Sequence, residues 1–138
     1  FCRFRQVLFA LKPNCFFFLS ETNYIVENKG FCFNNQILEN INFLVEIAKY
    51  NNKKILLCSV LPAFDFPWRK ELNPAVKIIN LNKMIKEYAK EKKLKYGDYH
   101  SGIKDDKNGL DKIYTEDGVH PNEKGYQKMK EILLSYLK

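Results

Sequence analysis

Apolar residues along the chain fall alternately into short continuous runs and into stripes with helical spacing. The continuous runs, which suit buried strands of a parallel sheet, lie at residues 15–19 and 55–60, and a shorter strand is predicted at 94–99. The stripes place apolar residues three and four positions apart and predict four helices, within residues 4–11, 37–48, 78–88 and 122–136. The chain therefore alternates helices with strands.

This alternation predicts βαβ crossovers, and hence an α/β fold with a parallel sheet and helices on both of its faces. The 138 residues fit a single domain. In sheets of this kind, ligands bind beyond the carboxyl ends of the strands. That rule directs the search for a functional site to three loops, at residues 20–33, 61–74 and 99–121.

The composition is that of a globular domain, with 46% hydrophobic and 28% charged residues. The net charge is +7, but the lysine clusters at residues 90–95 and 124–130 lie on expected helices and are interrupted by glutamates. We interpret both clusters as solvated helix faces. A nucleic-acid-binding module stays a third hypothesis, without aromatic–basic interleaving to support it. No stretch approaches the roughly 20 apolar residues of a membrane span.

The four cysteines show neither CxxC nor zinc-type spacing: Cys2, Cys15, Cys32 and Cys58. Two of them, Cys15 and Cys58, lie in apolar runs, where a thiol behaves as a small hydrophobe. We therefore expect reduced, mostly structural cysteines and no metal site.

The stretch at residues 115–122, Thr-Glu-Asp-Gly-Val-His-Pro-Asn, carries the strongest indication of chemistry. Asp117 lies three residues before His120, where the last loop meets the last helix. A catalytic triad needs an acid that orients an imidazole and a base that takes a proton from a hydroxyl, and these two residues can supply both. Gly118 gives the backbone freedom to turn, and Asn122 is a good helix N-cap. Taken alone, the stretch could equally be a helix-capping turn with a surface histidine.

A second stretch, at residues 20–24, follows the first predicted strand. Its Asn23 could direct a side-chain amide at a developing oxyanion. Taken alone, this residue is more simply a solvent-facing loop asparagine. The second histidine of the chain, His100, is interpreted as a lone polar loop residue after the third strand.

Together the two stretches resemble the SGNH/GDSL hydrolases (GDSL-like lipases and acylhydrolases), which are named for a nucleophilic Ser, an oxyanion Gly, an oxyanion Asn and a catalytic His. Asp-Gly-Val-His-Pro-Asn, with Gly-Tyr at 125–126, is similar to the last motif of that family. The resemblance implies that Asp117 and His120 are the acid and the base of a triad. Residues 20–25 lie where the family carries Gly-x-Asn-Asp, which implies that Asn23 is an oxyanion donor.

The loop at residues 58–69 also resembles that of bacterial members, where it helps to wall the active site. Its candidate substrate contacts are Pro62, Trp68 and Arg69. The resemblance further implies a three-layer α/β/α flavodoxin-like sandwich from which one or more N-terminal strands are missing. Residues 1–138 would then be the C-terminal part of one hydrolase domain, with neither a metal nor an organic cofactor.

The Gly-Asp-Ser motif and the oxyanion Gly of the family have no counterpart in the chain. The serines present lie outside any sharp strand-to-helix turn of the kind that presents a nucleophile: Ser20, Ser59, Ser101 and Ser135. Glu21 stands in place of the motif glycine and Tyr24 in place of the aspartate. A carboxylate near an oxyanion hole would oppose the charge that forms there. Loss of the first strand also predicts an exposed sheet edge or apolar face.

These observations leave two functional hypotheses besides the nucleic-acid module. In the first, the chain is part of a serine esterase that hydrolyses small acyl esters, such as the acetylated sugars or lysolipids that the resemblance implies. In the second, it is a catalytically inactive remnant that keeps the fold and at most binds a ligand. The sequence does not indicate the cellular compartment.

Overall fold

The structure is a computed structural model that describes residues 10–11, 13–19, 32–68 and 72–137. Its sheet has three parallel strands in the order β1 (Cys15–Leu19), β2 (Lys54–Cys58) and β3 (Lys95–Gly97). Two helices alternate with them along the chain, α3 (Cys32–Tyr50) before β2 and α4 (Pro74–Glu91) before β3. The predicted α/β fold with a parallel sheet is confirmed.

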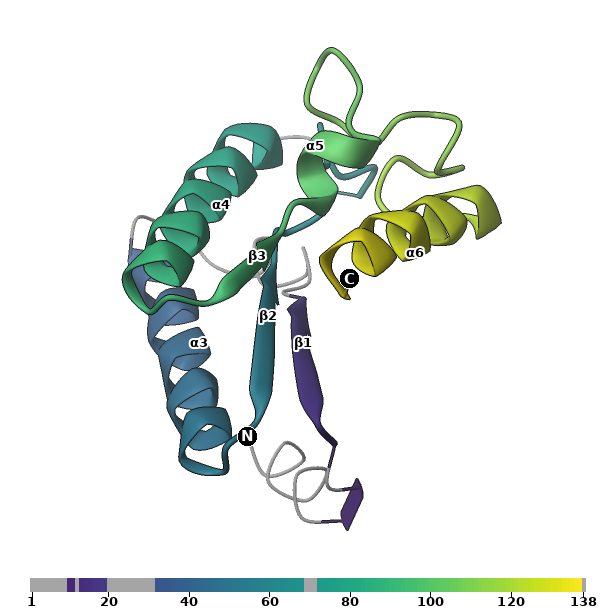
Figure 1. Cartoon of the computed structure of the whole chain (residues 1–138). Coiled ribbons are helices and arrows are strands. Elements are labelled where there is room, and N and C mark those ends of the chain that lie inside the picture. The colour runs from purple at the N-terminus through teal and green to yellow at the C-terminus, as the bar shows by residue number, and fades with distance from the viewer. Residues whose placement is uncertain (1–9, 12, 20–31, 69–71, 138) are drawn as a thin grey trace.

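Helices cover both faces of the sheet, which confirms the three-layer α/β/α arrangement (Figure 1). Successive residues of a strand point to opposite faces. In β2, Ile55 and Leu57 pack with α3 and α4, whereas Leu56 and Cys58 pack with α6 (Glu123–Leu137). All four side chains are at most 7% exposed. Burial on both faces explains why this strand reads as a continuous apolar run.

The stripes predicted for the two helices on the first face are buried, except that Leu44 of α3 is only half-buried. The buried residues are Ile37, Ile41, Val45 and Ala48 of α3, and Ile78, Leu81, Ile85 and Tyr88 of α4. A fully buried Val, Leu or Ile side chain contributes about 1.5–3 kcal/mol relative to an exposed one, so this layer supplies much of the stability of the domain. Pro74 starts α4, where its missing N–H removes no helical hydrogen bond.

On the second face, α6 contacts a cluster formed by Leu56, Cys58 and Tyr99. The helix residues that make this contact are Met129, Ile132, Leu133 and Tyr136. The sequence predicts Tyr126 in the same stripe, but its side chain is 62% exposed. That part of the prediction is wrong, because the contacts of α6 with this cluster begin only at Met129 and its first turn lies beyond them.

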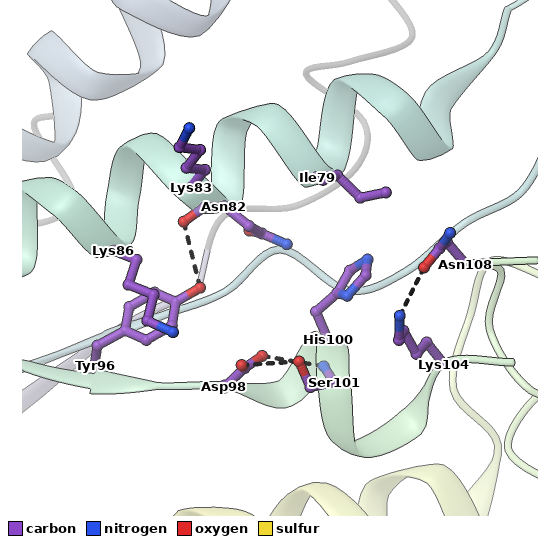
Figure 2. Close-up of a pocket in the computed structure, with 10 residues that line it drawn as sticks. All are labelled: Ile79, Asn82, Lys83, Lys86, Tyr96, Asp98, His100, Ser101, Lys104 and Asn108. Atoms are coloured by element: carbon purple, nitrogen blue, oxygen red, sulfur yellow. Dashed lines mark hydrogen bonds between the residues drawn. The ribbon is translucent and has the colours of Figure 1, made fainter. Parts of the chain in front are cut away.

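A short helix, α5 (Tyr99–Ile103), follows β3 where the sequence predicts a polar loop. Asp98 caps this helix, since its carboxylate accepts hydrogen bonds from the backbone N–H and the hydroxyl of Ser101, at 3.0 and 2.9 Å. The cap also ends β3 at Gly97, earlier than predicted. The interpretation of His100 as a surface loop residue is wrong, because α5 turns it toward α4 and leaves it only 8% exposed (Figure 2).

Among the described residues, β1 pairs with β2 alone and forms an edge of the sheet. Phe17 and Leu19 are in register with Leu56 and Cys58, so they share the face on which α6 packs. They are nevertheless 44% and 40% exposed. Within the part of the chain that is described, no helix is both long and apolar enough to span a membrane.

Candidate active site

Asp117 and His120 form a hydrogen-bonded pair in the turn that precedes α6. Oδ2 of Asp117 lies 2.6 Å from Nδ1 of His120. A carboxylate that accepts from Nδ1–H fixes the imidazole tautomer and leaves Nε2 free to accept a proton. The side chains of His120 and Asp117 are 65% and 44% exposed, so the pair is accessible to a ligand.

The second carboxylate oxygen of Asp117 binds the turn itself. Oδ1 accepts hydrogen bonds from the backbone N–H groups of His120 and Val119, at 2.8 and 2.9 Å. The backbone N–H of His120, together with its imidazole, holds the pKa of the Asp117 carboxyl well below its usual range. The carboxylate is therefore charged at neutral pH, and both of its oxygens are engaged in orienting His120.

The turn is fixed by its smaller residues as well. Gly118 has a φ of +82°, a left-handed conformation that costs a residue with a side chain. Its N–H donates to the Thr115 hydroxyl oxygen at 3.0 Å, and that hydroxyl lies 2.7 Å from the carbonyl oxygen of His120. Val119, between the paired residues, is 3% exposed and belongs to the main core. The turn therefore sits on the core with Asp117 and His120 facing outward.

Asn122 attaches this turn to α6. Its Oδ1 accepts from the N–H of Gly125 at 3.0 Å, and its Nδ2 donates to the carbonyl oxygen of Ile113 at 3.2 Å. The predicted N-cap is confirmed. Glycine at position 125 lets the first turn of α6 lie close to the backbone of Tyr114, because a Cβ there would lie 2.6 Å from the carbonyl oxygen of Tyr114.

The loop after β2 brings an aromatic side chain to His120. Phe66 is fully buried, and Trp68 stacks on it with ring centroids 5.5 Å apart. Trp68 is itself 51% exposed, and its ring lies 6.4 Å from that of His120, with the two planes 27° apart. Of the two predicted substrate contacts that the structure describes, Pro62 and Trp68, it is Trp68 whose ring stacks with that of His120.

The other predicted site residues lie elsewhere or outside the described residues. Pro62 is fully buried, so any part it takes in substrate binding is through the loop conformation, and this role stays a prediction. Asn23 and Arg69 lie outside the described residues, as do Glu21 and Tyr24. The oxyanion role of Asn23 therefore also stays a prediction.

Two residues that hold the loop after β2 are not indicated as functional by the sequence pattern. Asn82 of α4 is 8% exposed, and its amide accepts from the N–H of Val60 at 2.7 Å and donates to the carbonyl oxygen of Val60 at 3.0 Å. Ser59 is fully buried and its hydroxyl accepts from the N–H of His100 at 2.8 Å. The available signal for Asn82 was its spacing, four residues after Ile78 and three before Ile85, which places an asparagine on the apolar stripe of α4.

The described serines do not bind the acid–base pair. Ser59 is committed to α5, Ser101 donates to the Asp98 carboxylate, and Ser135 donates to the carbonyl oxygen of Ile132 within α6. Among the described residues, moreover, no three His, Cys, Asp or Glu side chains are grouped as a metal site would require. Burial raises the pKa of the Cys58 thiol to about 11, so this cysteine is inert at neutral pH.

Comparison with known proteins places the chain in a family. The profile of the GDSL-like lipase/acylhydrolase family matches residues 18–128. An acetylxylan esterase from Xylanibacter ruminicola is 39% identical over 85 residues, which are 62% of this chain and 16% of that protein.

Solved structures give the same result. A GDSL-like lipase from Bacteroides thetaiotaomicron matches with a TM-score of 0.87 and 36% identity, over 97% of this chain and 66% of that one. A candidate acylhydrolase from Bacteroides fragilis matches with a TM-score of 0.87 and 35% identity, over 97% of this chain and 65% of that one. The chain thus spans about two thirds of these proteins. It belongs to the GDSL-like lipase/acylhydrolase family.

Proposed function

We propose that residues 1–138 are the C-terminal part of a serine ester hydrolase, in which Asp117 and His120 act as the acid and the base of a catalytic triad. The observation that carries this proposal is the 2.6 Å contact between Oδ2 of Asp117 and Nδ1 of His120 on an exposed turn. This contact leaves Nε2 as the proton acceptor that a hydroxyl nucleophile needs.

The nucleophilic serine and the oxyanion glycine would come from a segment that precedes Phe1. The structural relatives support this, since the chain matches only 66% and 65% of their lengths. The exposed side chains of Phe17 and Leu19 on the edge strand β1 also leave room for further structure there. Asn23 would contribute an amide to the oxyanion hole.

In the proposed reaction, the serine oxygen attacks the acyl carbonyl while Nε2 of His120 takes the hydroxyl proton. The C–O bond to the alcohol then breaks, and the imidazolium returns the proton to the departing oxygen. Water then attacks the acyl carbon and loses a proton to His120. The bond between the acyl carbon and the serine oxygen breaks, the imidazolium returns its proton to that oxygen, and the acid leaves. Asp117 stays ionised throughout and stabilises the imidazolium, a role that its lowered pKa suits.

Small acyl esters are the substrate class that we propose, with acetylated sugars ahead of lysolipids. The relative from Xylanibacter ruminicola is an acetylxylan esterase, which favours an acetyl group on a carbohydrate. Trp68 beside His120 supports the same choice, because an exposed aromatic ring offers a flat surface on which a sugar ring can pack.

The test is hydrolysis of 4-nitrophenyl acetate and of acetylated xylan by the intact gene product, made from its native start. We expect turnover, a loss of roughly 1,000-fold or more in kcat for His120→Ala and Asp117→Asn, and little change for Glu116→Gln, an exposed neighbouring carboxylate. Turnover that survives His120→Ala would contradict the proposal.

The competing function is a catalytically inactive remnant that keeps the fold. The departures at Glu21 and Tyr24 favour it, as does the lack of a described serine bound to His120. An intact gene product that lacks a Gly-Asp-Ser motif and hydrolyses neither ester would establish the remnant and refute the esterase.

A further inference from the structure

A cavity of about 350 Å³ lies between α4, β3 and α5 (Figure 2). Neither Asp117 nor His120 is among the described residues that line it. Its walls carry two buried polar side chains, His100 of α5 and Asn82 of α4. Ligand binding in this cavity is independent of the proposed esterase function.

His100 lines this cavity and carries a buried polar atom without a described partner. The residue is 8% exposed, and its Nε2 is buried without a hydrogen-bond partner in the described part of the chain. The backbone of His100 is held in place, since its N–H donates to the hydroxyl of Ser59 at 2.8 Å. Buried polar atoms without partners are rare in native proteins, and a bound ion or water is one of the explanations for them.

The charges around the cavity indicate whether a ligand there would be an anion or a cation. Three lysines line it, Lys83 and Lys86 from α4 and Lys104 from the end of α5. The carboxylate of Asp98 is the one acidic group among the described lining residues, and it already accepts two hydrogen bonds from Ser101. The cavity therefore carries a net positive charge that favours an anion.

Two of these lysines are held by neighbouring side chains but form no ion pair with a described carboxylate. Nζ of Lys104 donates to Oδ1 of Asn108 at 2.7 Å, which uses one of its three protons and leaves two for a ligand. Lys86 lies over the ring of Tyr96, with Nζ 5.9 Å from the ring centroid, so it too is held at the cavity wall. Neither ammonium group is paired with a described carboxylate.

We propose that this cavity binds a small oxyanion, the phosphate or carboxylate group of a small molecule, through Nε2–H of His100 and the ammonium groups of Lys86 and Lys104. Burial, and after it the charge of Lys104, lowers the pKa of His100 while Asp98 opposes this, so the ring enters the complex as a neutral donor. The two lysines supply the charge, and His100 supplies the buried, directional contact.

The proposal is tested by titrating the intact protein at neutral pH with inorganic phosphate and, separately, with sodium acetate, while the His100 ring is followed by NMR. Sodium chloride at equal ionic strength is the control for screening. We expect a saturable shift of the His100 ring resonances with one of the two anions, and the anion that gives it identifies the oxyanion class.

Variants separate a built site from general attraction to a basic protein. Lys104→Met removes an exposed cation whose side chain is hydrogen-bonded to Asn108. The substitution should lower the affinity for the anion about tenfold. His100→Gln keeps an amide donor near the same point, and His100→Ala removes it. We expect the affinity for the anion to decrease from the wild type to His100→Gln and further to His100→Ala. Lys130→Met on α6, outside the cavity, should bind as wild type does.

Two results would overturn the proposal. The first is that neither anion moves the His100 resonances beyond the effect of sodium chloride. The second is that Lys104→Met and Lys130→Met weaken binding equally, which would show attraction to the overall charge. Because Lys104→Met leaves the buried ring in place, the test stands even if His100→Ala fails to fold.

Discussion

The ring of Trp68 lies almost parallel to that of His120, with centroids 6.4 Å apart and planes 27° apart. The two residues come from different loops, one after β2 and the other before α6. Trp68 is in turn stacked on the buried ring of Phe66, which ties it to the core. The acid–base pair thus has an aromatic neighbour that is anchored to the core, and in the proposed function the alcohol part of an ester packs on it.

Trp68→Ala should lower kcat/KM for an acetylated sugar about fivefold to tenfold in the intact protein, mainly through KM, because it removes an aromatic contact worth about 1 kcal/mol. Phe64→Ala is the matched control, since Phe64 is an exposed aromatic residue of the same loop with no ring contact to His120. Equal effects of the two substitutions on steady-state kinetics would contradict the role assigned to Trp68.

The pair can also be monitored without substrate, because Trp68 is the single tryptophan of the chain. Removing the neighbouring imidazole changes the surroundings of the indole, so His120→Ala should change the fluorescence emission of Trp68 at neutral pH. In Glu116→Gln the emission should stay that of the wild type. Identical emission from wild type and His120→Ala would show that the two rings are not in contact.

Asp117 should stabilise the folded protein in a pH-dependent way. Its pKa is lower in the folded state than the ordinary carboxyl value of 3.8, so its contribution is present above that value and is lost as the pH falls toward the folded pKa. After allowance for its exposure, we expect Asp117→Asn to cost about 1 kcal/mol at neutral pH. Urea unfolding at neutral pH and below pH 3.8 should show a difference from wild type that shrinks with acid.

Gly118→Ala should destabilise the turn through its backbone alone. The φ of +82° disfavours a side chain, while a Cβ there would meet no atom within 4 Å. We expect a cost of about 1 kcal/mol in urea unfolding for alanine and less for asparagine, which adopts left-handed conformations more readily. A larger cost for Gly118→Asn than for Gly118→Ala would indicate that crowding, not conformation, selects glycine.

Asn82→Leu should lower the stability of the fold more than the small change in side-chain volume suggests. The substitution leaves both the N–H and the carbonyl oxygen of Val60 buried without their partner, at a cost of about 3 kcal/mol in unfolding free energy. Asn80→Leu, on the exposed side of the same helix, should change stability by less than about 0.5 kcal/mol. Similar values for both variants would mean that Asn82 does not hold the loop after β2.

Local features of the site could be predicted from the sequence because they depend on neighbouring residues. Asp117 and His120 are three positions apart, and Asn122 caps the helix that begins at Glu123, so spacing alone indicates both interactions. Strand and helix stripes were predictable for the same reason, since β2 is buried on both faces and the buried positions of α4 repeat every three or four residues.

Long-range features could not be predicted in this way. The pairing of Asn82 with Val60 and that of His100 with Ser59 join residues 22 and 41 positions apart, and no periodicity records such contacts. His100 in particular looks like a surface residue until the Asp98 cap turns the chain into α5. The cap was present in the sequence as Asp-x-x-Ser, but its effect on His100 depends on where α4 packs.

In the proposed function, Asp117 and His120 together activate a serine in the intact protein. An aryl fluorophosphonate tests this most directly, because it labels a serine only when a neighbouring base has activated it, and intact mass records the adduct. We predict one phosphonyl group on the wild-type protein and on Glu116→Gln, with labelling slowed at least about 100-fold in His120→Ala and Asp117→Asn. Equal labelling rates in all four proteins, or no labelling of the wild type, would contradict the account.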